Sequence, residues 1–354
     1  MPHTHNTTGQ TSLVAHEEYI KSRGGKAIDA LQKTNDRGMI AMEVLGSEGI
    51  REEGSIRADG IEIRLGNWGR VNMNVQTRKL LDLVLAKITA QVPYGENATR
   101  HALVDTFEVT ITLAEFMEIE GLKDKRNARE QFRAAAECII SLSLNFDYET
   151  FKGTGKHRKL VKEHFGYYLL EGTTERRTLE KDPIVNSEIV FTFSIKVLEY
   201  FCTRHILPLN IKLFRINPKT HPHAYNIGRK LMEHFNANAW KGEPVRLSIK
   251  SLIAYCPELP SVEEVREKEH RKYREKIQEP VQRELDALAD EYGIIESWHY
   301  CHSGGVPLSD EELANHNFKD WLDFQIEFTL PDYPDITERR KKFLAKKKKH
   351  AAKS

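Results

Sequence analysis

One order of predicted elements occurs twice in this sequence, over residues 72–200 and again over residues 217–330. In each stretch a helix is followed by a short strand, two further helices, and two strands joined by a hairpin that bears glycine. The chain of 354 residues is long enough for each copy to bury a core of its own. The repeat therefore predicts an α+β protein with two similar domains in tandem.

The first copy begins with apolar residues at helical spacing from Val75, and this helix should end before Pro93. Thr112, with Glu115 three residues later, has the pattern of a capping box, and Gly121 is a suitable C-terminal cap. The other elements expected here are a strand at 107–111, a third helix from 124 to 142, and strands at 144–151, 160–170 and 189–195.

The second copy opens with a helix that carries Tyr225 and Leu231 on its apolar face. Ser261 and Glu264 predict the start of a long helix, which Pro280 should kink or restart. The other elements expected here are a strand at 245–249, a short helix at 251–255, a strand with Trp298 and Tyr300, a glycine turn at 303–305 and a closing strand at 322–328.

Composition divides the remainder of the chain. Residues 1–70 are rich in Gly, Thr, Ser and charge, which predicts a partly disordered N-terminal arm with one short strand at 61–65. The two domains are expected at residues 71–205 and 206–335, followed by a basic tail at 336–354.

The net charge of +1 conceals an uneven distribution. Residues 339–354 carry nine basic residues and no acid, so the rest of the chain has 44 basic against 52 acidic residues. A site for a polyanion on the body must therefore be a local basic patch. The tail is interpreted either as a disordered solubilising terminus or as a non-specific contact to phosphates.

Several classes of protein are disfavoured. No apolar run approaches the roughly 20 residues that span a bilayer, and the polar start lacks the apolar stretch of a signal peptide, so we expect a cytoplasmic protein. The scattered cysteines predict buried thiols and neither a disulfide framework nor a zinc site. They are Cys138, Cys202, Cys256 and Cys301. No cofactor motif or metal site is expected.

The repeated order of elements is that of a winged helix, a module that reads duplex DNA. On the third helix of the first copy, Arg126, Arg129 and Arg133 fall roughly 120° from the buried stripe, with only Glu130 nearby. Guanidinium groups in this arrangement can reach phosphates or guanine edges. An isolated stripe could equally be a solvated helix face, but its place on the third helix favours a DNA contact.

Two further basic sets are candidates for DNA binding. The hairpin of the first copy is expected to form a wing beside the helix, and its positive charges are Lys152, Lys156, Arg158 and Lys159. On the long helix of the second copy the basic residues are Lys268, Arg271, Lys272 and Lys276. Glutamates alternate with these lysines, so salt bridges on a solvated helix are the competing explanation.

One enzymatic alternative is a DNA-nicking site. His221 and His223 are similar to the two-histidine metal motif of rolling-circle nicking endonucleases, which also need a tyrosine such as Tyr148. That motif lies on a central strand, whereas Pro222 would deny the strand a hydrogen bond and a helix follows. A non-enzymatic protein is therefore the expectation.

These patterns together resemble the two-winged-helix replication initiators of iteron-type theta-replicating plasmids and related mobile elements. The resemblance covers roughly residues 70–330 and lies in Thr112–Phe116 leading into Asn127–Phe132, in Lys276–Pro280 through Leu285–Leu288, and in Gly293–Trp298. The long arm, the extended first wing and the lysine-rich tail depart from the family pattern.

The resemblance implies recognition of repeated double-stranded sites at an origin, opening of adjacent DNA, recruitment of host replication proteins, and repression of the protein's own promoter as a homodimer. The residues alone support sequence-specific binding of double-stranded DNA. Two non-enzymatic alternatives stay open. One is a transcriptional regulator of a mobile element, and the other is an interaction scaffold that uses winged helices for protein contacts.

Overall fold

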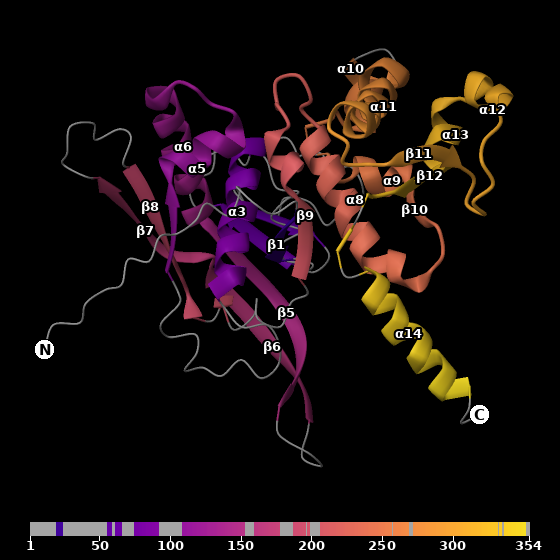
Figure 1. Cartoon of the computed structure of the whole chain (residues 1–354). Coiled ribbons are helices and arrows are strands. Elements are labelled where there is room, and N and C mark those ends of the chain that lie inside the picture. The colour runs from indigo at the N-terminus through magenta and orange to yellow at the C-terminus, as the bar shows by residue number, and fades with distance from the viewer. Residues whose placement is uncertain are drawn as a thin grey trace, which may run out of the picture.

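A computed structural model describes residues 19–23, 55–58, 61–65, 74–91, 108–152, 159–177, 187–195, 197–198, 206–256, 258–268, 272–331, 333–334 and 336–351. These residues form two halves that lie side by side, with strand β1 (Tyr19–Arg23) between them (Figure 1). We call residues 55–198 the first half and residues 206–351 the second half. Both halves combine helices with antiparallel sheets, so the predicted α+β class is confirmed.

Three helices and a three-stranded antiparallel sheet form the body of the first half. In chain order the elements are α3 (Val75–Gln91), β4 (Glu108–Thr112), α5 (Leu113–Glu120), α6 (Lys125–Ile140), β7 (Leu170–Arg177) and β8 (Ser187–Phe193). β8 lies between β4 and β7 in the sheet. The predicted capping box is present, because Thr112 Oγ1 accepts from the Glu115 N–H at 3.2 Å and the Glu115 carboxylate accepts from the Thr112 N–H at 2.9 Å. Gly121 ends α5 at a φ of 63°.

The hairpin that the sequence assigned as the first wing belongs to a different sheet. That sheet has the order β2 (Ser55–Ala58), β3 (Ile61–Leu65), β5 (Leu142–Lys152) and β6 (Lys159–Tyr168). β5 and β6 pair along their whole length, up to Lys152 opposite Lys159. The hairpin attached to the β4 sheet is instead β7–β8. The strand predicted at 61–65 is confirmed, whereas β2 was not predicted.

The second half repeats the layout of the first. Its elements are α8 (Ala224–Asn238), β10 (Val245–Ser248), α9 (Ile249–Ile253), α10 (Val262–Lys268), β11 (Ser297–Cys301) and β12 (Gln325–Thr329). The sheet order β10-β12-β11 matches β4-β8-β7. Between β11 and β12 lie α12 (Asp310–Asn315) and α13 (Phe318–Asp323), so the closing strand predicted from residue 322 begins later. The reason is Asn317, whose side chain accepts from the N–H groups of Lys319 and Asp320 and starts α13.

The predicted long helix of the second half is divided into pieces. Ser261 and Glu264 form the expected reciprocal hydrogen bonds at the start of α10, each 3.0 Å long. Farther along are a π turn η4 (Arg274–Gln278), α11 (Glu279–Asp286) and a second π turn η5 (Ala287–Glu291). The Glu279 N–H donates to the Arg274 carbonyl five residues back, immediately before Pro280, which has no N–H to donate. Gln278 and Glu279 keep right-handed helical φ and ψ, so the predicted kink or restart at Pro280 corresponds only to this change from π to α hydrogen bonding within a continuous helical segment.

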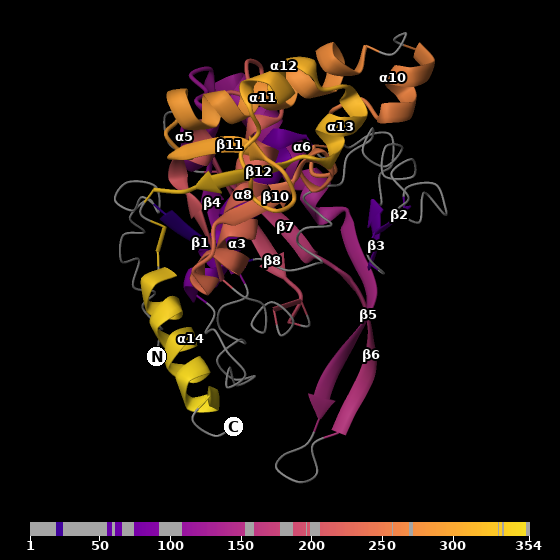
Figure 2. The ribbon, with the colours of Figure 1, turned by 90° about the vertical axis from the view of Figure 1, so that its right-hand side faces the viewer.

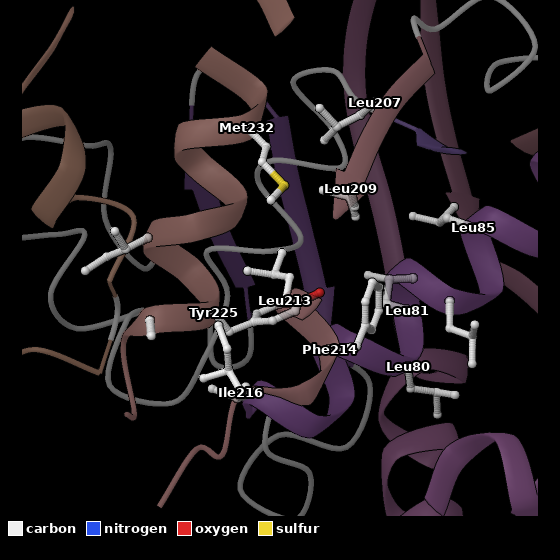
Figure 3. Packing of buried hydrophobic residues seen from close by; sticks show 14 of the residues in the cluster. Leu80, Leu81, Leu85, Leu207, Leu209, Leu213, Phe214, Ile216, Tyr225 and Met232 are labelled. Atoms are coloured by element: carbon white, nitrogen blue, oxygen red, sulfur yellow. The ribbon is translucent and has the colours of Figure 1, made fainter. Parts of the chain in front are cut away.

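The apolar cores of the two halves are continuous. Figure 3 shows leucines of α3 facing β9 (Ile206–Asn210) and η2 (Ile211–Arg215), with Tyr225 and Met232 of α8 on the other side. Because α3 belongs to the first half and α8 to the second, these apolar contacts hold the halves together.

A buried polar network crosses the same junction. Asp82 of α3 is fully buried, and its Oδ2 accepts from Arg229 Nε at 2.8 Å and from the Tyr225 hydroxyl at 2.6 Å, both on α8. Burial and the Asp82 charge raise the pKa of Tyr225, which keeps its hydroxyl a neutral donor. Arg78 of α3 pairs with Glu258 of the second half. Removal of either partner of such a pair would leave a buried charge uncompensated.

Strand β1 lies in the part of the chain that the sequence assigned to the N-terminal arm. It pairs antiparallel with β9 and packs on α3, and Ile20 and Ser22 are buried. The Ser22 hydroxyl donates to Asp82 Oδ1 at 3.3 Å, and the Tyr19 hydroxyl donates to the Pro331 carbonyl at 2.7 Å. Most of the chain separates β1 from its partner strand, so no local pattern predicted this pairing.

The basic tail forms helix α14 (Ile336–Ala351), not the disordered or flexible terminus expected from its composition. Ile336 packs on the core, and Arg339 donates to Asn236 Oδ1 of α8 at 2.5 Å. Lysine is a good helix former, and the Glu338–Lys342 pair at 2.6 Å adds an i,i+4 contact. Figures 1 and 2 show α14 projecting from the second half on the side away from α10.

The cysteine prediction holds where the structure describes the residue. Cys138, Cys256 and Cys301 are buried thiols, and Cys202 lies outside the described residues. Within the described ranges, no helix combines the length and apolar character that a membrane span requires.

Candidate nucleic-acid interface

Helix α6 presents the predicted basic stripe. The Asp124 side chain caps its first turn by accepting from the Arg126 N–H at 3.1 Å. The buried face matches the prediction and consists of Ala128, Phe132, Ala135, Ala136, Cys138 and Ile139. Phe132 stacks on Phe116 of α5 with ring centroids 4.8 Å apart, which fixes the rotation of α6 about its own axis.

The arginines of α6 do not share one environment. A single carboxylate, Glu175 of β7, accepts from Arg129 Nε and Nη2 at 3.2 and 3.1 Å and from Arg133 Nε at 2.9 Å. The side chains of Arg129 and Arg133 are 19% and 43% exposed. Arg126 is 87% exposed and lies 4.0 Å from Glu130. Glu175 therefore holds two of the three arginines side by side, although the sequence indicated Glu130 as their only acidic neighbour.

The basic hairpin is distant from this stripe. Lys152 and Lys159 are opposite each other at the far end of the β5–β6 hairpin, and Lys156 and Arg158 lie outside the described residues. In both Figure 1 and Figure 2 this end is the lowest part of the first half, whereas α6 lies high. The structure does not place the hairpin beside α6, so the expected wing-and-helix pair is not formed by these residues.

The basic set of the second half lies on and after α10. Lys268 is 3.7 Å from Glu264, and Lys272 is 3.6 Å from Glu275. Both lysines are more than half exposed, Lys276 is half-buried, and Arg271 lies outside the described residues. The intrahelical salt bridges expected from the sequence are present. They are weak in water, so they leave these lysines able to contact a polyanion.

The candidate helices of the two halves lie on one side of the molecule. α6 of the first half and α10 of the second half occupy the upper side in both views, whereas the β5–β6 hairpin and α14 extend downward (Figures 1 and 2). The sequence-predicted residues are thus divided between two opposite sides.

The two histidines of the nicking alternative are in different settings. His221 Nδ1 lies 2.8 Å from Glu284 and its Nε2 lies 3.1 Å from Glu291, so carboxylates occupy both ring nitrogens. His223 begins α8 and is buried, and desolvation lowers its pKa to about 4. Tyr148 lies on β5 in the first half. Over the part of the chain that the structure describes, no cluster of three or more His, Cys, Asp or Glu could hold a metal.

The two carboxylates that the sequence analysis missed act across long separations. Glu175 reaches α6 from β7, and Asp82 reaches α8 from α3. No local signal identifies such a carboxylate. A search for acids opposite predicted basic stripes could have suggested Glu175, provided the pairing of β7 were already known.

Comparisons with known proteins give limited information. No family model matches the chain, and no curated protein matches it. Two crystal structures of domains 2 and 3 of RctB have a similar arrangement. The first is 12% identical with a TM-score of 0.39, covering 81% of this chain and 95% of that chain. The second is 12% identical with a TM-score of 0.36, covering 78% and 91%. At these values the similarity carries no information on function.

Proposed function

We propose that this protein binds double-stranded DNA in a sequence-specific manner, with two winged-helix modules that contact neighbouring stretches of one duplex. The observation that carries the proposal is the repeated layout. In both halves a helix, a strand and two further helices precede the last two strands of a sheet with equivalent strand order, and α6 and α10, on or after which the candidate basic residues lie, are on one side of the molecule (Figures 1 and 2). A third helix in this setting is the element that enters a major groove.

The two halves would contribute different contacts. In the first half, Glu175 holds Arg129 and Arg133 in a fixed arrangement, which favours hydrogen bonds to base edges. In the second half, Lys268 and Lys272 are exposed point charges, which favours contacts to phosphates. The first half would then supply much of the specificity, and the second half would supply affinity.

The role proposed for this binding is replication initiation at repeated sites in the origin of a plasmid or another mobile element, in the cytoplasm. It rests on the resemblance of the sequence motifs to iteron-type initiators. Host replication proteins and a second copy of the chain are the partners that this role implies.

Footprinting on the DNA that flanks the protein's own gene tests the role. An initiator should protect tandem direct repeats, each by about one helical turn or more. Protection confined to a promoter without repeats would favour the transcriptional regulator. DNA binding that survives loss of the basic residues on both third helices would favour the interaction scaffold.

The proposal also includes binding without strand cleavage. Both nitrogens of His221 are occupied by carboxylates, and the buried His223 lies at the start of a helix. Incubation of the purified protein with supercoiled DNA and divalent metals should leave the DNA uncut. A covalent protein–DNA adduct, at Tyr148 or elsewhere, would overturn this part of the proposal.

A further inference from the structure

The second half contains an open cavity of about 330 Å³ between the helical segment 274–286, strand β11 and helix α12. Arg274, Gln278 and Gln282 line one wall, and Trp298, Tyr300 and His316 contribute to the others. We call this cavity the Gln278 pocket. Its volume is at the lower end of the range for sites that hold small organic groups. We propose that the Gln278 pocket binds an unpaired nucleobase of single-stranded DNA, an inference that rests on the proposed function.

The polar chemistry of the pocket centres on Gln278, which is only 5% exposed. His316 Nδ1 lies 2.8 Å from the Leu313 carbonyl, so in the neutral ring Nδ1 carries the proton and Nε2 is an acceptor. Gln278 Nε2 therefore donates to His316 Nε2 across 2.7 Å. This contact fixes the orientation of the Gln278 amide.

The Gln278 carbonyl oxygen accepts no hydrogen bond from the residues that the structure describes, and it is not one of their fully buried side-chain atoms. A donor that enters the open pocket can therefore reach this oxygen without displacing a protein partner. An amide that offers an oriented acceptor beside a donor matches the exposed edge of an unpaired base, where amino or imino groups donate and ring nitrogens or carbonyls accept.

Aromatic and basic groups complete the complementarity. Trp298 is half-buried, and its ring lies at 87° to that of Tyr300 with centroids 5.2 Å apart. Aromatic walls of this kind are used to stack splayed bases. Arg274 is 72% exposed at the rim, 3.6 Å from Glu279, where its guanidinium can reach a phosphate next to the bound base.

The position of the pocket favours a DNA strand over an isolated nucleotide. Of the described residues that line the pocket, Arg274 is the one with a permanent charge, which is too little positive charge for a triphosphate. The segment that carries Arg274 and Gln278 also carries Lys272, which we propose as a phosphate contact. A strand that follows these charges would bring its bases past the opening. The π turn at 274–278 is also of a type that often occurs at functional sites.

The experiment compares the intact protein with Gln278→Met, using anisotropy of short labelled oligodeoxynucleotides and, in parallel, of a duplex site. Gln278→Met keeps the length of the side chain and removes its amide, and Gln91→Met at the exposed end of α3 is the matched control. We expect about a tenfold loss of affinity for the single strand, with duplex affinity changed less than about twofold. Trp298 fluorescence should be quenched by the single strand, and Trp298→Phe should remove most of that quenching.

Arg274→Gln, with Arg215→Gln as its exposed control, provides a second test that does not disturb a buried side chain. Arg274→Gln should weaken binding of the single strand more than binding of the duplex. Duplex binding without single-strand binding would overturn the pocket assignment and leave the proposed function intact. Equal affinity for a free deoxynucleotide and for the strand would make the pocket a nucleotide site and also overturn the assignment. If the wild-type protein binds neither the single strand nor the duplex, the proposed function itself is contradicted.

Discussion

The third helices of the two halves occupy equivalent places in the fold but hold their charges differently. On α6, Arg129 and Arg133 share the carboxylate of Glu175, which comes from another strand. On and after α10, the carboxylates that pair with Lys268 and Lys272 among the described residues are glutamates of the same segment, at 3.7 and 3.6 Å. The first arrangement restricts where the charges can lie, and the second leaves them able to follow a polyanion.

In the proposed DNA complex, this difference would let one topology support two kinds of contact with DNA. A guanidinium pair fixed from a neighbouring strand loses little entropy when it meets a base edge. Long lysine side chains lose more, but they accept phosphates in many positions. The two halves should therefore respond differently to salt, to acid and to substitution.

The largest expected effect is that of salt on the whole protein. If both halves contact the duplex through about 6–10 phosphates, affinity should fall by roughly 10³–10⁵-fold between about 50 and 200 mM salt. Titration of a labelled duplex at several salt concentrations measures the slope. A nearly flat response would show that only one half, or neither, contacts the backbone. Lys272→Gln should reduce the magnitude of the slope by about one.

The next effect concerns the junction that joins the halves. Asp82→Ala leaves the buried Arg229 without its carboxylate, which should lower the free energy of unfolding by about 3–5 kcal/mol. Asp323→Ala is the control, because Asp323 pairs with Lys250 on the surface, where solvent screens the pair and its loss should leave stability nearly unchanged. Urea unfolding should show one transition in both proteins. Two separate transitions, with only one of them shifted, would mean that the halves fold independently.

Low pH should lower the free energy of unfolding through a buried histidine of the second half. Burial lowers the pKa of His223 to about 4 from its ordinary value of 6.5. Below about pH 6.5 the His223 imidazole of the unfolded chain therefore takes up a proton. In the folded chain the same imidazole stays neutral until about pH 4. The contribution of His223 to the free energy of unfolding is fully present above pH 6.5. Roughly 3 kcal/mol of it should be lost as the pH falls from 6.5 to about 4. His223→Gln should remove that loss in urea unfolding at several pH values. Loss of the same size in the variant would assign it to other groups.

Base recognition gives a smaller effect that separates the two helices directly. Arg133→Ala should cost about 1–3 kcal/mol on the true site and much less on scrambled DNA, since it removes a fixed donor. Lys272→Ala should weaken both duplexes to a similar extent, because it removes a phosphate contact. Competition binding on the two duplexes measures both ratios. If Arg133→Ala weakens both duplexes equally, α6 only positions the protein, and specificity must come from the second half.

The smallest effect concerns helix caps. Thr112→Ala removes the cap of α5 in the first half, and Ser309→Ala removes the capping box of α12 in the second. Each should cost about 1 kcal/mol. Thr112→Ala should cost more, because Glu115 also pairs with Lys87 of α3 at 2.6 Å. Thermal unfolding of the two variants measures the difference. A larger loss for Ser309→Ala would show that the coupling to α3 contributes nothing.

Local signals predicted local structure well. Thr112, Glu115 and Gly121 marked both ends of α5, and Pro280 marked a change from π to α hydrogen bonding, because caps and proline act within a few residues. The sequence did not predict which hairpin joins the β4 sheet, since β5 and β6 alternate regularly, whereas β7 has Leu170 as its one apolar residue and so lacks a strand pattern. It also placed Leu322 on a strand, because a short helix and a strand share an apolar alternation over a few residues.

The candidate site was only partly predictable for the same reason. The buried face of α6 follows from its helical period, so the direction of its arginines was correct. The partner of Arg129 and Arg133 comes from β7, and the Gln278 pocket combines α11, β11 and α12. Such combinations depend on tertiary packing, which a single sequence does not specify by spacing.

Strand β1 has a consequence for the order in which the chain is made. Its partner β9 is made only after more than half of the chain, and its contact at Pro331 later still, so a nascent chain exposes this strand edge until residue 210 has been translated. An unpaired edge of this kind invites pairing with the wrong strand or with another nascent chain. The burial of Ile20 and Ser22 is therefore completed late, and synthesis, more than the finished fold, is the period in which wrong pairing of this strand competes with native pairing.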